Sequence, residues 1–178
     1  MASLASAEVS YPRCRLAGMQ WISVETPIGA LGVAAEHGEI VALHFGGVGR
    51  GRVADDPEPV LREAAAQLEA YFRGELTEFD LPLADPEGSE FDKEVWRHIA
   101  AVPYGEMITY GEIAAAAGQP SAAREVGGAC NRNPVAIFVG CHRVVGAGGK
   151  LVGFGGGLDR KRYLLALEAR VRMERDFA

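Results

Sequence analysis

Residues 109–130 read TYGEIAAAAGQPSAAREVGGAC, and this stretch contains two short helical patterns joined by a turn. Thr109 and Glu112 match the capping box that opens a helix, which we expect to run through Ala117. Gly-Gln-Pro stops that helix, and Ser121 is placed to cap a second one that ends near residue 130. The pattern predicts a helix-turn-helix, whose second helix would meet a nucleic acid. Many helical hairpins bind nothing, so this geometry alone does not settle the function.

The second helical pattern is poor in bulky side chains. Ala123 and Gly127 are among the alanines and glycines on it, and Arg124 would project from the smooth surface that they form. Two glycines cost a helix about 1–2 kcal/mol relative to alanine, so a compensating benefit is expected. Either the helix packs closely against a neighbouring helix, or it approaches the groove of a nucleic acid.

Beyond this stretch, an apolar run leads into a cysteine followed by a histidine. Residues 135–139 are all apolar, which predicts a buried strand that delivers Cys141 and His142 at its end. Thiolate is the reactive form of cysteine, and an imidazole can accept the thiol proton. Neighbouring residues on a strand point to opposite faces, so His142 can serve Cys141 only if the chain turns there. The alternative is a small buried cysteine beside a hydrogen-bonded histidine.

Two glycine-rich loops follow, at residues 146–150 and 151–157, and then a helix from Asp159 to Glu168. Neither loop has the GxGxxG or GxxxxGKS/T spacing of the usual phosphate-binding motifs, so a flat aromatic ligand pressed against backbone fits them better. Glu168 is either a solvated carboxylate at the helix end or the partner that fixes the tautomer of His142.

The first half of the chain has a different pattern. Short apolar runs separated by turn signals over residues 21–45 predict an antiparallel meander, and residues 58–72 have helical spacing. An acidic, proline-containing segment follows, and Ser89 then opens a helix that ends near Pro103. The predicted fold class is α/β (α+β), with a small N-terminal antiparallel-sheet domain and a mainly helical C-terminal domain. We expect a flexible leader at 1–18, an N-terminal α/β domain at 19–80, a linker at 81–88, the domain with the helix-turn-helix at 89–170 and a tail at 171–178.

Composition places the 178-residue chain among soluble globular proteins, since 48% of its residues are apolar and 24% are charged. No apolar stretch approaches the ~20 residues that span a bilayer, and no secretory signal opens the sequence, so we expect a cytoplasmic protein without a membrane partner. Cys14, Cys130 and Cys141 are an odd number without paired spacing, and the four histidines are scattered. We therefore predict neither a metal nor another cofactor.

Charge is unevenly distributed along the chain. The formal net charge is −6, but residues 25–94 hold 5 Lys/Arg against 16 Asp/Glu, whereas residues 119–168 hold 7 against 3. This uneven distribution would allow a basic functional surface on an otherwise acidic protein. Runs of like charge are nevertheless usually only solvated surface.

Six motifs, taken together and in order, are similar to those of one known family. They are YGE (104–106), ITY (108–110), AREVG (123–127), NP (133–134), CHRVV (141–145) and GGGL (155–158). The chain resembles the O6-alkylguanine-DNA alkyltransferases, also called methylated-DNA–protein-cysteine methyltransferases. The resemblance covers residues 89–168 most distinctly.

This resemblance implies direct, single-turnover DNA repair. The protein would bind double-stranded DNA through the minor groove as a monomer and flip O6-alkylguanine into a pocket, because a stacked base cannot present its alkyl carbon for in-line displacement. One alkyl group per chain would pass irreversibly to Cys141, less readily from O4-alkylthymine.

The resemblance also implies roles for individual residues. Cys141 attacks the alkyl carbon, His142 removes the thiol proton through a water, and Glu168 orients His142, while Asn133 braces the helix against the active-site segment. Arg124 fills the place that the flipped base leaves. The implied DNA contacts are Tyr110, Arg124, Ala123, Gly127 and Ser121, and the implied base pocket is formed by Tyr110, Val144, Phe154 and Gly155.

Three positions depart from the family pattern. Gly140 stands where proline usually precedes the cysteine, Phe154 stands where tyrosine is common, and Gly155 stands where a small polar residue can occur. Glycine frees a backbone that proline would fix, and phenylalanine removes a hydroxyl. We expect a roomier, less polar pocket that accepts bulkier alkyl groups.

Two other functions remain open. An alkyltransferase-like protein would bind O6-alkylguanine and flag it for another pathway, but such proteins usually lack the cysteine that this chain has. A thiol hydrolase would account for the cysteine and histidine, but it would leave Tyr110 and the helix of Arg124 unexplained.

Overall fold

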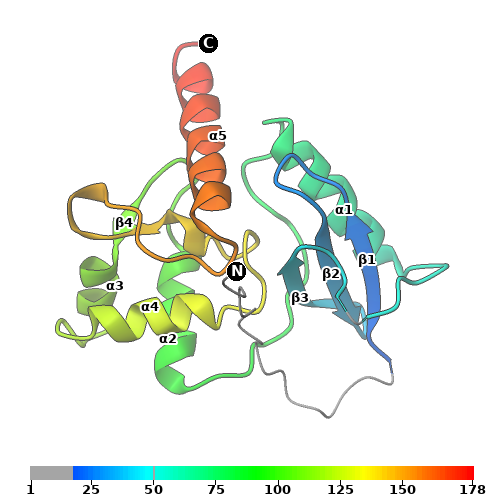
Figure 1. The fold of residues 1–178 in the computed structure, drawn as a ribbon, viewed down its shortest axis with the longest axis horizontal. Helices are drawn as coiled ribbons and strands as arrows, with labels where there is room; N and C mark the ends of the chain where they lie inside the picture. Colours follow the sequence, from blue (N-terminus) through cyan, green and yellow to red (C-terminus); the bar gives the residue numbers. More distant parts are fainter. Residues whose placement is uncertain (1–17, 50) are drawn as a thin grey trace, which may run out of the picture.

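The computed structural model describes residues 18–49 and 51–178, which form two halves with a long helix between them (Figure 1). The predicted leader, including Cys14, lies outside the described residues except for Gly18. The first half is a three-stranded antiparallel sheet in the order β1-β2-β3, with β1 at Gln20–Val24, β2 at Leu31–Glu36 and β3 at Glu39–Phe45. The predicted meander and fold class are confirmed.

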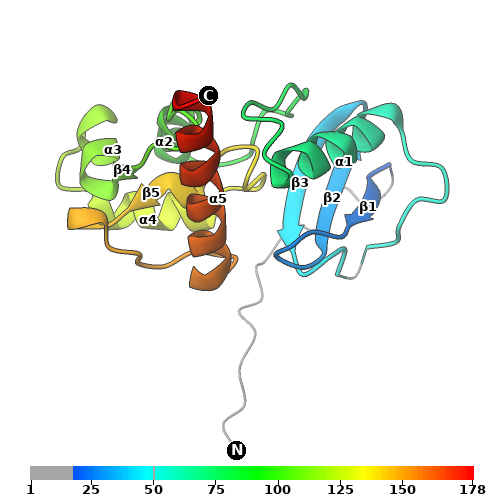
Figure 2. The same cartoon turned by 90° about the horizontal axis from the view of Figure 1, so that it is seen from above.

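Helix α1 (Pro59–Phe72) covers one face of this sheet (Figure 2). Proline at its first position suits a helix start, because the missing N–H would have no partner there. Leu61, Ala64 and Leu68 are completely buried at helical spacing, so the apolar stripe found in the sequence faces the sheet. The last turn of α1 carries Tyr71, also completely buried, to the boundary with the second half.

The second half contains the predicted helices. The predicted capping box at Thr109 with Glu112 is confirmed, and Ser89, which opens a helix as predicted, forms a second box with Asp92. The elements in chain order are α2 (Glu90–Ala100), β4 (Ile108–Thr109), α3 (Tyr110–Ala116), α4 (Ala123–Asn131), the 3-10 turn η1 (Cys141–Arg143), β5 (Val144–Val145), the 3-10 turn η2 (Ala147–Gly149) and α5 (Leu158–Asp176).

The start of α4 differs from the prediction. Ala122, not Ser121, precedes the helix, and no side chain caps it. Ala122 N donates to Gln119 O at 2.9 Å, which closes a turn and delays the helix by one residue. Ala122 is buried while Ser121 is exposed, so this corner is anchored by an apolar contact in place of a polar cap.

The predicted buried strand at 135–139 is wrong. Val135, Ala136 and Ile137 are buried, but Ile137 has φ +73° and the segment makes only isolated bridges. The Asn133 side chain accepts from Val135 N and donates to Val139 O, at 3.1 and 2.9 Å, and so folds the segment into a compact loop. An apolar run is compatible with burial in either form, and here the side-chain hydrogen bonds decide.

Helix α5 extends beyond the predicted end. It continues through residues 171–176, which the sequence assigns to a tail, because Val171 is buried and the residues after it favour helix. In Figure 2, α5 stands between the sheet half and the other helices. Its completely buried residues include Lys161, Leu164 and Glu168, so a helix that bears many charges still has a buried face.

Two-residue strands form a connection that the sequence does not reveal. β4 pairs in parallel with β5, with Ile108 opposite Val144 and Thr109 opposite Val145. This pairing sets the start of α3 beside the segment that carries Cys141. No helix in the described residues is long and apolar enough to cross a membrane.

Candidate active site and DNA interface

Cys141 and His142 lie in the 3-10 turn η1, so the chain turns where the proposed chemistry requires it. Cys141 is 4% exposed and His142 is completely buried. Asn133 holds the loop that leads into this turn, and its amide lowers the pKa of the Cys141 thiol in part. The structure therefore brings three predicted site residues together: Asn133, Cys141 and His142.

His142 pairs with Glu168, whose Oε1 lies 2.7 Å from His142 Nε2. An ionised carboxylate can only accept hydrogen bonds, so Nε2 carries the proton and Nδ1 presents a lone pair. Within the described part of the chain, Nδ1 has no hydrogen-bond partner. Burial lowers the pKa of His142, and the hydrogen bond that His142 donates to Glu168 offsets this only in part. His142 is thus neutral near pH 7, with one nitrogen able to take a proton.

Glu168 is a buried carboxylate surrounded by donors. Besides His142, it accepts from Tyr71 Oη at 2.7 Å, from Gly105 N at 2.9 Å and from Arg143 Nε and Nη2 at 2.9 and 3.0 Å. Burial alone would raise the pKa of Glu168, but the hydrogen bonds and charges of His142 and Arg143 outweigh it and hold that pKa well below its ordinary value. Glu168 is therefore ionised at neutral pH.

Burial raises the pKa of the Cys141 thiol, while the Asn133 hydrogen bond and the positive charge of Lys161 lower it in part. The resting group at neutral pH is therefore a thiol, and a base must take its proton before it can attack carbon. His142 is the neutral base next to it in the chain.

Lys161 on α5 contacts three segments of the chain near Cys141. Its side chain is completely buried, and Nζ donates to Val144 O at 2.5 Å and to Gly153 O at 3.4 Å. The Tyr110 hydroxyl lies 3.4 Å from the same nitrogen. The ammonium also lies 5.7 Å from the centre of the Tyr110 ring, and its positive charge lowers the pKa of the Cys141 thiol in part.

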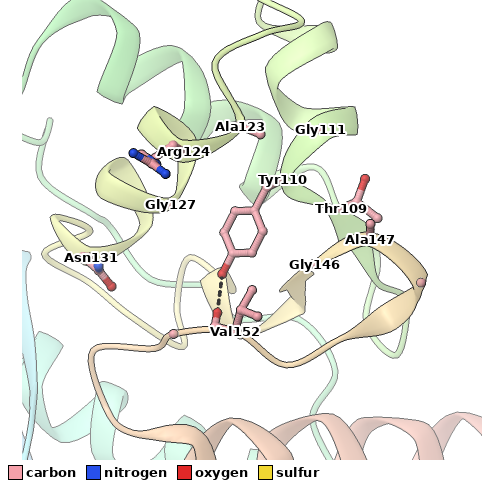
Figure 3. Close-up of a pocket in the computed structure, with 12 residues that line it drawn as sticks. Thr109, Tyr110, Gly111, Ala123, Arg124, Gly127, Asn131, Gly146, Ala147 and Val152 are labelled. Atoms are coloured by element: carbon pink, nitrogen blue, oxygen red, sulfur yellow. Dashed lines mark hydrogen bonds between the residues drawn. The ribbon is translucent and has the colours of Figure 1, made fainter.

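A groove of about 790 Å³ lies between the helix-turn-helix and the loop after β5 (Figure 3). Tyr110, Ala123, Arg124 and Gly127 line it, as the resemblance implied, whereas Ser121 is outside the groove-lining set. Tyr110 reaches across the groove and donates to Val152 O at 3.0 Å. Arg124 is exposed, and Gly127 leaves the groove surface free of a side chain.

Of the residues predicted to form the base pocket, Tyr110 alone lines this groove. Val144 is completely buried, and Phe154 packs edge-on against Phe45 of β3 with ring centroids 5.4 Å apart. Gly155 is exposed, and a side chain there would meet no atom within 4 Å. Cys141, Val144, Phe154 and Gly155 do not line the groove. Lys161 Nζ connects it to Val144, because the same nitrogen contacts Tyr110 and Gly153 of the groove lining.

Sequence reasoning missed four residues that shape the site: Tyr71, Gly105, Arg143 and Lys161. Gly105 and Arg143 stand inside quoted motifs, which was an available signal. Gly105 has φ +75°, and a side chain there would press on Arg172 and on the Glu168 carbonyl at 3.0–3.2 Å. Tyr71 is 97 residues from Glu168 in sequence, and no local pattern relates them.

Comparisons with known proteins match most of the chain, and the matches carry related names. The family model described as "6-O-methylguanine DNA methyltransferase, DNA binding domain" matches residues 90–170, and that described as "6-O-methylguanine DNA methyltransferase, ribonuclease-like domain" matches residues 19–84. A methylated-DNA--protein-cysteine methyltransferase of Methanosarcina acetivorans is 50% identical over 154 residues, which are 84% of this chain and 98% of that protein. A protein of the same name from Mycolicibacterium paratuberculosis is 63% identical over 107 residues, 60% of this chain and 64% of that protein.

One solved structure adds a DNA complex. The crystal structure of Mycobacterium tuberculosis OGT in complex with DNA matches with a TM-score of 0.77 and 45% identity, over 85% of this chain and 94% of that one.

Proposed function

This chain belongs to the 6-O-methylguanine DNA methyltransferase family, and on that premise we propose that Cys141 is the residue that receives the alkyl group. The protein is a DNA-binding enzyme that repairs DNA directly, by moving an alkyl group from methylated DNA to a cysteine of its own chain. The observation that carries the assignment is the buried His142–Glu168 pair, because it leaves a basic nitrogen directly after Cys141 in a 3-10 turn.

The proposed step is an in-line displacement at the alkyl carbon. His142 Nδ1 takes the thiol proton, directly or through one water, and the sulfur forms a bond to carbon as the bond between carbon and O6 breaks. The electron pair of that bond passes to the guanine, which gains one proton, equal to the proton that the thiol loses. Glu168 stabilises the imidazolium that forms in between. A thioether has no easy hydrolytic exit, so each chain acts once.

Groove geometry supports a minor-groove complex with a flipped base. The surface of α4 facing the groove carries Ala123 and Gly127, which permit close approach, and Arg124, which we assign to the place of the extruded nucleotide. Extruding a base costs a few kcal/mol, which a side chain inserted into the stack offsets in part. Tyr110 lines the groove and contacts Lys161, which also holds the Val144 carbonyl, and we assign it to guide the base inward.

The substrate class we propose is O6-alkylguanine in double-stranded DNA, with O4-alkylthymine as a poorer substrate. The missing phenol hydroxyl at Phe154 supports a less polar pocket and acceptance of bulky alkyl groups. We also propose that the protein acts as a monomer, and that the domains divide at a linker over residues 81–88.

The experiment that tests this function measures intact mass after incubation with a duplex carrying O6-methylguanine. The native protein should gain a single methyl group even with excess DNA, and Cys141→Ala should gain none. Cys130→Ala is the matched control, because Cys130 is the second thiol that the structure describes, and it should still be methylated. Tight binding without a mass change would favour the lesion-binding alternative.

A further inference from the structure

A tyrosine from the N-terminal half reaches the proposed catalytic carboxylate. Tyr71, at the end of α1, donates its hydroxyl to Glu168 Oε1 at 2.7 Å. The same oxygen accepts from His142 Nε2, also at 2.7 Å. Arg143 Nη2 donates to it as well, at 3.0 Å, so Tyr71 and His142 are two of three donors that share the negative charge of one oxygen.

We propose that Tyr71 is a positioning residue that holds Glu168 and sets how readily His142 takes the proton of Cys141. This inference rests on the proposed role of His142 as the base. The N-terminal half would then influence the proton transfer. Helix α1 packs on the sheet, while Tyr71 in its last turn donates a hydrogen bond to Glu168 of α5.

The Tyr71 hydroxyl is a fixed donor. Glu168 is ionised and can only accept, so the phenol must donate. Burial and the neighbouring Glu168 raise the pKa of Tyr71 well above its ordinary value, so it does not ionise in the working range. Its ring is completely buried and lies against Phe72, Phe79 and Tyr104, with centroids 5.2–6.0 Å away. Packing on three sides leaves the hydroxyl little freedom to turn elsewhere.

Removing this donor should strengthen the interaction between Glu168 and His142. The charged groups that act on His142 are Glu168, Arg143 and Lys161. Arg143 keeps its hydrogen bonds to both carboxylate oxygens, so Glu168 stays ionised when the hydroxyl is lost. More of the charge on Oε1 then faces Nε2, which favours imidazolium. His142 would become protonated at a higher pH and would lose its ability to accept the thiol proton there.

A matched control is available at Tyr104. Its hydroxyl is buried and has no hydrogen-bond partner among the described residues, and its ring lies 6.0 Å from that of Tyr71. Tyr104→Phe deletes the same atom from the same aromatic cluster without removing a donor from Glu168. Any general effect of losing a buried hydroxyl is common to both variants.

The test follows the rate of methyl transfer from O6-methylguanine duplex against pH for the native protein, Tyr71→Phe and Tyr104→Phe. A hydrogen bond to a charged group is stronger than one between neutral groups, and its loss from Glu168 passes in part to His142. We expect Tyr71→Phe to react about three- to tenfold more slowly than native at pH 6 and within about twofold of native at pH 9. Tyr104→Phe should follow the native profile.

A second measurement keeps the inference independent of DNA repair. The 15N shifts of the His142 ring, followed against pH in the Cys141→Ala background, should show a raised pKa of His142 in Tyr71→Phe. Because this readout needs no alkyl transfer, it separates failure of the inference from failure of the proposed function. If Tyr71→Phe does not fold, 3-fluorotyrosine at position 71 keeps the ring and donates more strongly, and the pKa of His142 should then fall. An unchanged titration of His142 in the variant that folds, or a pH profile matching Tyr104→Phe, would overturn the proposal.

Discussion

Replacing Glu168 by glutamine tests the buried network at its centre. The carboxylate accepts five hydrogen bonds, from Tyr71, Gly105, His142 and Arg143. Glutamine has nearly the same volume, but it replaces one acceptor oxygen by an NH2 group that points at donors. The Arg143 side chain, 11% exposed, loses its counter-charge. The change therefore breaks a buried ion pair and leaves donors facing donors.

The expected cost is large. Removing one partner of a buried ion pair destabilises a protein by about 3–5 kcal/mol, against a total stability of roughly 5–15 kcal/mol. For a chain of this size, that corresponds to a Tm lower by roughly 6–20 °C. Alkyl transfer should also slow, because His142 loses the group that fixes its tautomer and stabilises its charged form.

The pH dependence follows from the lowered pKa of Glu168. A carboxyl whose pKa is lower in the folded state contributes stability above its unfolded pKa and loses it as pH falls toward the folded value. The difference in unfolding free energy between native and Glu168→Gln should thus be constant above about pH 5 and shrink below about pH 4.5. The comparison cancels the other carboxyls, which titrate in both proteins.

Urea unfolding followed by circular dichroism at several pH values measures this difference. Glu174→Gln is the matched control, because it makes the same change at an exposed position of the same helix and should alter stability by less than about 0.5 kcal/mol. The reasoning is refuted if Glu168→Gln costs less than about 1 kcal/mol at pH 7, or if its cost does not shrink in acid.

Three further substitutions address other parts of the account. Arg124→Ala should slow repair of duplex DNA far more than reaction with free O6-benzylguanine, and equal losses on both would assign Arg124 to the fold. The double variant G140P/F154Y should react more slowly than native with O6-benzylguanine: φ at Gly140 is −72°, which proline can adopt, but a proline Cβ would lie 3.1 Å from the Arg143 guanidinium carbon. Equal rates would count against a roomier pocket. Trp96→Phe removes the 2.8 Å hydrogen bond from the indole to the Ala129 carbonyl on α4 and should cost about 1–3 kcal/mol in urea unfolding; an unchanged midpoint would contradict that contribution.

Local signals in the sequence predict the elements where side chains and backbone agree. The capping boxes at Ser89 and Thr109 locate the starts of α2 and α3, because a polar cap satisfies backbone N–H groups within four residues. The turn of β2 and β3 at His37 and Gly38, with φ of +54° and +80°, is equally local. Such signals need no knowledge of the rest of the chain.

Nonlocal contacts account for what the sequence did not predict. The loop around Asn133 has the composition of a strand and is bent by two side-chain hydrogen bonds. The pairing of β4 with β5 involves only two residues on each strand, too few for any periodicity to register. Tyr71 and Lys161 acquire their roles only once α1 and α5 are packed, since burial and distant partners determine what their polar atoms do.

The measurement that bears most directly on the account is a peptide map of the protein after reaction with O6-methylguanine DNA. The account predicts S-methylcysteine at Cys141 in nearly every chain, unmodified Cys130, and no further methyl transfer when fresh DNA is added. A methyl group on another residue, or release of methylated product with the Cys141 thiol regenerated, would contradict it.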